Sequence, residues 1–252
     1  MGPKLVRTWA QGVLVLVRDD LGTNRVTDKE PKFTRDLPES RRRQLIEATA
    51  RSLARHGLDG TTVRVVAAEA GVSPGLVRHH FAGMHDLIAE TYRWTGKEVE
   101  KALRAALTAA PDHPEAQLRA FVDASFSAPL LDPDLLGVWL TFWSLTRTDP
   151  EIHAIHGKVY ADYRKRLQRY LSGIAEHEKL DLDVRLAALA FTALLDGLWL
   201  EHCLDPSTFT AIEACQIAHD WVDTFKAGRF MAQTRADGAR PQVMAVPEAK
   251  AG

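Results

Sequence analysis

The segment from Thr62 to Phe81, TVRVVAAEAGVSPGLVRHHF, constrains the fold of this chain more than any other stretch. Apolar residues recur at helical spacing on both sides of a short turn, and Gly71 in that turn allows a sharp reversal that a Cβ would resist. Ser73 is placed to cap the second helix, and Pro74 stands in its first turn, where a missing N–H costs nothing. Small alanines in the first helix allow two steeply crossing helices to approach closely. The segment therefore predicts a helix-turn-helix corner.

The rest of the chain also has the pattern of helices, so the expected fold class is all-α. Apolar residues repeat every three to four positions, and three prolines beside acidic residues mark further helix starts. The expected helices cover 41–56, 63–70, a short segment after Ser73, about 86–107, three segments beginning near Pro114, Pro133 and Pro150, and about 183–204 and 207–225. A strand is also compatible with Val13–Val17, but we expect it to lack a partner.

Charge and composition divide the chain into four parts. The formal net charge is -1, yet residues 40–96 hold eight arginines against five acidic residues, so a basic segment is joined to an acidic body. We expect a flexible extension at 1–38, a helix-turn-helix domain of three helices at 39–99, a larger helical body at 100–227 and a disordered tail at 228–252. Because the whole chain is not a polycation, any affinity for nucleic acid must come from the basic segment.

The second helix of such a corner enters the major groove of double-stranded DNA with its N-terminal residues toward the base edges. Arg78 on its exposed face is suited to a bidentate contact with guanine, and free N–H groups at the helix starts suit phosphates. An isolated corner of this kind also occurs in helical proteins that do not bind DNA. The residues that we predict to contact DNA are Arg43, Thr62, Val63, Ser73, Pro74, Gly75, Arg78, His79 and His80.

With Asp86-Leu87 opening the next helix, this pattern resembles the TetR family of transcriptional regulators over about 39–225. Within the family, RRRQLIEAT at 41–49, WLTFW at 139–143 and ALLDGLWL at 193–200 are similar to the BetI subgroup, the choline-responsive repressors of glycine betaine synthesis. The resemblance implies a homodimer, a DNA-binding domain at 39–99, a ligand-binding and dimerisation domain at 100–227, and choline as a candidate effector.

Two positions depart from the family pattern. His80 stands where members often carry an aromatic residue, and Met84 stands where they often carry a lysine. An expected phosphate contact is therefore missing, which affects the expected operator sequence and affinity.

Aromatic residues in the body predict where a small molecule could bind. A quaternary ammonium favours an aromatic box with a carboxylate nearby, because cation–π attraction replaces lost hydration. Asp196 is costly among apolar neighbours unless it is paired, and Tyr160 and Tyr163 line the long helix that begins near Pro150. Aromatic residues at helical spacing are also typical of a plain core. The predicted ligand-binding residues are Trp139, Phe142, Trp143, Tyr163, Asp196 and Trp199.

Two C-terminal helices predict self-association. The helix at about 183–204 is apolar nearly all round, and the helix at about 207–225 carries an apolar stripe. Together they have more apolar surface than one body can cover, which favours a four-helix seam with a second copy. Two copies would place two reading helices about one DNA turn apart, roughly 34 Å, and would bind a near-palindromic operator.

Other classes of function find little support in the sequence. We find no motif typical of hydrolases, P-loop enzymes or dinucleotide-binding proteins, so we expect no enzyme and no cofactor. His153 and His156 near a helix start are typical of exposed surface rather than a metal site. Cys203 and Cys215 fall on apolar faces, where a thiol behaves as an inert hydrophobe.

The apolar run at 186–200 is too short for a membrane span and contains an acid, and no signal peptide is evident, so a cytoplasmic protein is expected. Two alternatives stay open. The first is a TetR-type regulator of an unrelated operon that responds to another hydrophobic or cationic ligand. The second is a helical interaction protein that does not bind DNA.

Overall fold

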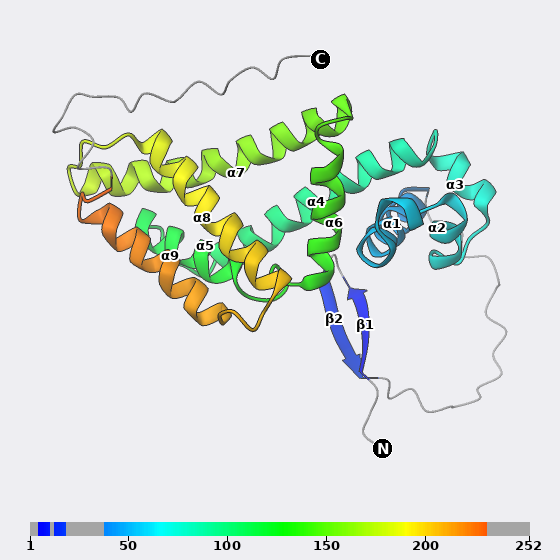
Figure 1. Ribbon diagram of the computed structural model, residues 1–252, viewed down its shortest axis with the longest axis horizontal. Helices are drawn as coiled ribbons and strands as arrows, with labels where there is room; N and C mark the ends of the chain where they lie inside the picture. Colours follow the sequence, from blue (N-terminus) through cyan, green and yellow to red (C-terminus); the bar gives the residue numbers. More distant parts are fainter. Residues whose placement is uncertain (1–4, 11–12, 19–37, 231–252) are drawn as a thin grey trace, which may run out of the picture.

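The computed structural model describes residues 5–10, 13–18 and 38–230 of the 252. Within these ranges the chain forms nine α-helices and one β-hairpin (Figure 1). The helices are α1 (Pro38–Gly60), α2 (Val63–Glu69), α3 (Pro74–His80), α4 (Met84–Leu107), α5 (Pro114–Ser125), α6 (Pro133–Leu145), α7 (Pro150–His177), α8 (Val184–Leu204) and α9 (Ala211–Lys226). The predicted helical class is therefore confirmed.

The prolines predicted to open helices do so, because a first-turn residue needs no N–H and an acidic residue precedes two of them. Asp149 caps α7 by accepting hydrogen bonds from the N–H groups of Glu151 and Ile152. The helix predicted from about 207 begins later, at Ala211. Thr210 and Glu213 form a reciprocal capping box there, which fixes the start of α9.

The expectation that a strand near Val13 would lack a partner is wrong. Strand β1 (Leu5–Ala10) pairs with β2 (Val13–Arg18) in antiparallel register, with Val6 opposite Val17 and Thr8 opposite Val15. Val and Thr favour extended backbone, and the first segment, LVRTWA, supplies the partner strand. The hairpin lies within the predicted flexible extension at 1–38. The rest of that extension up to residue 37, and residues 231–252 of the predicted tail, lie outside the described residues.

Helices α1, α2 and α3 form a small unit with a core of its own. Leu45 of α1, Val66 of α2 and Val77 of α3 are almost fully buried, and Phe81 closes the core just after α3. Gly71 between α2 and α3 has φ +64°, the left-handed conformation that the predicted turn requires. This packing holds α3 with one face against the unit and the other face outward.

Helix α4 leads from the small unit into the body, and α6 stands across the junction between them (Figure 1). A separate apolar cluster fills this junction and contains Leu53 of α1, Tyr92 of α4 and Phe142 of α6. Gly137 of α6 lies so close to α1 that a Cβ there would be 2.8 Å from the Ala54 carbonyl oxygen. The junction is therefore tightly packed, so a movement of α6 would also displace α1.

Helices α5, α7, α8 and α9 build the main core of the body together with the C-terminal half of α4. Phe121, Leu167, Phe191 and Phe225 are completely buried in it. Helices α8 and α9 lie on the side of the body away from α2 and α3 (Figure 1).

Candidate functional site

The first candidate site is the outward face of α3. Thr62 and Ser73 serve as the N-caps of α2 and α3, each accepting a backbone N–H at 3.3 Å. Arg78 projects from the exposed face and forms no ion pair or hydrogen bond with the described residues. Its guanidinium is therefore available to an external partner. The exposed members of the predicted DNA-contact set are Arg43, Thr62, Ser73, Pro74, Gly75, Arg78 and His79.

Val63 and His80 differ from the other predicted contacts because both are half-buried. Val63 packs against the core of the small unit. Burial lowers the pKa of His80, and the nearby charges of His79 and Arg42 act in the same direction, so His80 is neutral near pH 7. Neither residue offers the freely exposed charge that Arg78 offers.

Two residues next to this site, Arg42 and Met84, make contacts within the protein. Arg42 turns inward, where its Nη2 donates to Glu90 at 2.7 Å and its guanidinium lies 4.9 Å from the centre of the Phe81 ring. Arg43 stays exposed and donates from Nε to Glu47 at 2.8 Å. Met84, which stands in place of the expected lysine, packs against the cores of the small unit and of the junction.

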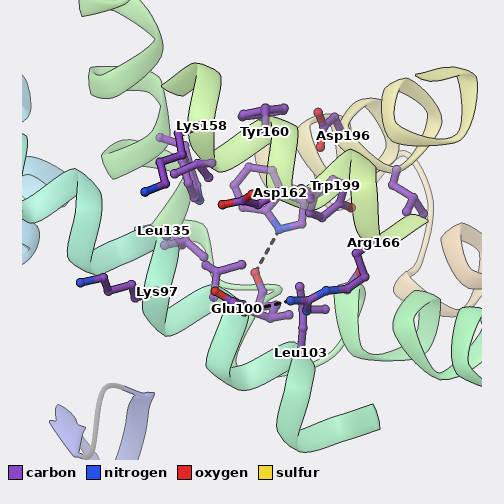
Figure 2. A pocket seen from close by; sticks show the side chains of 18 of the residues that line it. Lys97, Glu100, Leu103, Leu135, Lys158, Tyr160, Asp162, Arg166, Asp196 and Trp199 are labelled. Carbon is purple, nitrogen blue, oxygen red and sulfur yellow. Dashed lines mark hydrogen bonds and ion pairs between the residues drawn. The ribbon is translucent and has the colours of Figure 1, made fainter. Parts of the chain in front are cut away.

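The second candidate site is a cavity of about 500 Å³ in the body (Figure 2). Helices α4, α6, α7 and α8 supply most of its lining. Five of the six predicted ligand-binding residues meet there: Trp139, Trp143, Tyr163, Asp196 and Trp199. The sixth, Phe142, is absent from the lining. It is completely buried and stacks on Tyr92 at 4.1 Å between ring centroids, so it belongs to the core of the junction.

The aromatic wall of this cavity is held in place by its own contacts. The rings of Trp139 and Trp143 stack with centroids 6.3 Å apart, and those of Tyr160 and Tyr163 lie 6.4 Å apart. Trp199 donates its indole N–H to the carbonyl oxygen of Leu130 at 3.0 Å, which fixes the orientation of its ring. Such ordered π-faces favour a cation, since no reorganisation is needed when it enters.

Asp196 supplies a negative charge at the inner end of the cavity. Burial raises the pKa of its carboxyl to about 6, although the Tyr160 hydroxyl and Arg164 act in the opposite direction. Burial also raises the pKa of the Tyr160 and Tyr163 hydroxyls, and the charge of Asp196 adds to this effect. Near pH 7 the carboxyl is therefore mostly ionised but poorly solvated, a state that a bound cation would stabilise.

Several lining residues were not among the predicted ligand contacts. Those with ionisable side chains are Tyr160 and a set of charged residues from α4 and α7: Arg93, Lys97, Glu100, Lys158, Asp162 and Arg166. On α4 the spacing of Arg93, Lys97 and Glu100 by three and four residues places them on one face, a signal present in the sequence. Which neighbour that face meets is decided by the packing of α7, which the spacing alone does not give.

Comparison with known protein families identifies the family to which this chain belongs. Residues 45–91 match the family described as bacterial regulatory proteins of the tetR family, and residues 114–226 match the BetI-type transcriptional repressor C-terminal domain. This chain belongs to the TetR family of DNA-binding transcriptional regulators. The resemblance predicted from the sequence, including the BetI type of its C-terminal domain, is confirmed.

Individual relatives agree with this assignment. The TetR-family chain is 33% identical over 201 residues to the HTH-type transcriptional regulator BetI of Burkholderia mallei (strain NCTC 10229), covering 77% of this chain and 97% of the relative. A transcriptional regulator from Pseudomonas aeruginosa PAO1 has a crystal structure that is 46% identical, with a TM-score of 0.72, covering 80% of this chain and 97% of that one. A regulator from Saccharomonospora viridis, solved in complex with choline, is 22% identical with a TM-score of 0.66, covering 73% and 96%.

The described residues contain no helix that is both long and apolar enough to cross a membrane, and no cluster of three or more side chains suited to a metal ion. His156, one of the two histidines considered for metal binding, shares a hydrogen bond with the Tyr92 hydroxyl at 2.9 Å. Burial raises the pKa of the Cys203 thiol to about 11 and also raises that of Cys215. Both thiols are therefore poor nucleophiles near pH 7.

Proposed function

We propose that this TetR-family regulator is a homodimeric repressor whose operator binding changes when a quaternary ammonium such as choline enters the cavity of the body. The observation that carries the proposal is the half-buried carboxyl of Asp196 in a cavity lined by three tryptophans and two tyrosines. A carboxylate supplies the counter-charge, and the aromatic faces replace the hydration of the cation. Control of glycine betaine synthesis then follows as the proposed biological role.

The fold alone does not choose the ligand. One neighbour in the fold is described in complex with choline and another, FadR from Bacillus subtilis, in complex with stearoyl-CoA, at 22% and 17% identity. An apolar ligand would leave Asp196 desolvated and without a counter-charge, which costs free energy. The carboxylate of Asp196 therefore favours a cation over an acyl chain at its end of the cavity.

The proposed recognition of operator DNA rests on α3 and the residues around it. We assign operator contact to Arg43, Thr62, Ser73, Pro74, Gly75, Arg78 and His79, which are exposed, and to Val63 and His80 at the edge of the same surface. Phosphate contacts position the domain and Arg78 reads base edges. We assign domain 39–99 to this role and domain 100–227 to ligand binding and dimerisation.

Dimerisation is supported by exposed apolar side chains on α8 and α9. Leu189 is 49% exposed, Ile212 81% and Ile217 44%. A second copy that covers them would form the predicted four-helix seam, and its two-fold symmetry matches a near-palindromic operator. We assign no catalytic step, metal or cofactor to the chain, since regulators of this family act by binding, and we place it in the cytoplasm with its DNA.

A gel-shift on the DNA upstream of the chain's own gene, across a salt series and with or without choline, tests this function. Specific binding should persist at moderate salt, and choline should change it. Asp196→Asn should bind the same DNA but lose the response to choline, whereas Glu176→Gln, an exposed acid of α7, should keep both. A response to choline that survives Asp196→Asn would remove the ligand assignment, and binding that is weak and steeply salt-dependent would remove the operator assignment.

A further inference from the structure

The cavity is larger than a small quaternary ammonium requires. Choline has about seven non-hydrogen atoms, so it fills roughly 200 Å³ if each atom takes about the 30 Å³ that a water molecule occupies in the liquid. The cavity measures about 500 Å³. A choline molecule at Asp196 would therefore leave more than half of the space to something else.

The space that remains is bordered by two lysines. Lys97 of α4 and Lys158 of α7 both line the cavity, and Figure 2 shows them on the side of the cavity away from Asp196. Both are exposed, and neither forms an ion pair or a hydrogen bond with the described residues. The cavity thus has the half-buried carboxylate of Asp196 at one end, and at the other end two exposed ammonium groups that form no ion pair with the described residues.

The other basic groups of the lining are already paired. Arg93 bonds to Glu90 and Glu151, each at 2.7 Å. Arg166 bonds to Glu100 at 3.0 Å (Figure 2). Nearby carboxylates already balance the charges of these two arginines, so the arginines select a ligand less strongly than the two lysines do.

Two acidic groups also face the outer part of the cavity. Glu100 is held by Arg104 and Arg166, which keep the pKa of its carboxyl below its usual range despite partial burial. Asp162 of α7 is exposed and offsets one of the two lysine charges. The outer end therefore keeps a positive balance, which favours an anionic group on the ligand.

We propose that the ligand of this cavity is a zwitterion, with a quaternary ammonium at Asp196 and a carboxylate or phosphate ester at Lys97 and Lys158. The inference rests on the proposed function, because its ammonium end is the same cation site. It adds a second recognition element that choline itself cannot use, since choline carries a neutral hydroxyl where the zwitterion carries an anion. A ligand that carries both groups gains affinity from the carboxylate of Asp196 and from the ammonium groups of the two lysines.

The test compares choline with phosphocholine and carnitine, which carry a phosphate and a carboxylate, by titration calorimetry on the full chain. The zwitterions should bind roughly fivefold or more tightly than choline at low salt, as two exposed ion pairs allow, and the advantage should shrink as salt rises. The double variant Lys97→Gln/Lys158→Gln should lose this advantage and keep the affinity for choline. Lys165→Gln is the matched control, because Lys165 is an exposed lysine of α7 outside the lining.

The outcomes separate the two proposals. Choline that binds as well as or better than both zwitterions would overturn the zwitterion and leave the cation site in place. A zwitterion advantage that persists in the double variant would also overturn the role of the lysines. If neither choline nor a zwitterion binds to the wild-type chain, the cation site and the inference built on it both fail. A preference for phosphocholine over carnitine, or the reverse, identifies the anionic group.

Discussion

Arg78 carries most of the sequence-reading role that we assign to α3. Its guanidinium is exposed and unpaired within the described chain, so a substitution removes no contact that the fold needs. Arg78→Ala should lower the affinity for the operator by about 1–3 kcal/mol and relax base preference at one position of each half-site. Competition gel-shifts with operators changed one base pair at a time measure both effects. Arg55→Ala, an exposed arginine of α1, serves as the control, and unchanged selectivity in Arg78→Ala would contradict the assignment.

The pKa of Asp196 predicts how ligand binding depends on pH. A cation is attracted by the ionised carboxylate only, and the pKa of this group in the ligand-free chain is about 6. Affinity for choline should therefore be nearly constant between pH 7 and 8 and fall as the pH drops through 6, by roughly tenfold at pH 5. Tryptophan fluorescence titrations at several pH values check this. The same affinity at pH 5 and pH 8 would show that Asp196 does not hold the cation.

The raised pKa of Asp196 also predicts that the ionised carboxylate, which attracts a cation, lowers the stability of the ligand-free chain. Burial raises the pKa of Asp196 in the folded chain from the ordinary 3.8 to about 6, so the contribution of this group to stability is full below about pH 4 and is lost as the pH rises through about 6. Asp196→Asn removes a poorly solvated charge and should stabilise the ligand-free chain by about 1–3 kcal/mol at pH 7.5. Thermal unfolding at pH 7.5 and pH 4.5 measures it, with the gain expected at the higher pH. A gain of equal size at both values would rule out the charge as its cause.

At the scale of elements, a chain of contacts joins the cavity of the body to the end of α3. Arg93 lines the cavity and bonds to Glu90 of α4; Glu90 also bonds to Arg42 of α1, and the Arg42 guanidinium lies over the Phe81 ring just after α3. Burial acts to raise the pKa of Glu90, but the two arginines hold it below its usual range. The carboxylate is therefore ionised at neutral pH and bridges α1 to α4.

We therefore expect Glu90→Gln to uncouple the two sites. The amide keeps the shape of the side chain but loses the charge that holds both arginines, so the small unit should follow movements of α4 less closely. Choline affinity and operator affinity should each stay within about threefold of wild type, while the effect of choline on operator binding should shrink. Gel-shifts at several choline concentrations measure this coupling. Glu47→Gln, which loses only the exposed pair with Arg43 within α1, is the control.

The sequence predicted the helices well because their ends carry local signals. The caps Thr62 and Ser73 act through hydrogen bonds to backbone N–H groups three residues on, and the prolines at 114, 133 and 150 act through a fixed backbone angle that suits the first turn of a helix. It predicted the cavity less completely, since the spacing that brings Trp139 and Trp143 to one face also fits Phe142. The stacking of Phe142 on Tyr92, which lies fifty positions earlier, is a long-range contact that helical periodicity cannot give. Two further features differ from the prediction. The Thr210–Glu213 capping box starts α9 four residues later than expected, and β1 supplies the partner strand of β2.

At the scale of the whole molecule, the dimer that we propose sets the spacing between its two α3 helices. A two-fold seam on α8 and α9 presents each residue twice, so one substitution places two changes in the interface. Leu189 and Ile217 are 49% and 44% exposed in the single chain, and both belong to these helices. Since α8 also carries Asp196 and Trp199, the proposed seam and the cavity share this helix.

A charge in the seam should therefore separate the copies without emptying the cavity. Leu189→Lys and Ile217→Lys should each give a monomer by sedimentation, because a lysine buried against its own symmetry mate costs several kcal/mol. Operator affinity should fall by about a hundredfold or more, since a single reading helix loses the second half-site. The cavity is already formed within the single chain, so choline affinity should change little. Leu140→Lys, at a 43% exposed leucine on α6, should stay dimeric, and a Leu189→Lys chain that still dimerises would place the seam elsewhere.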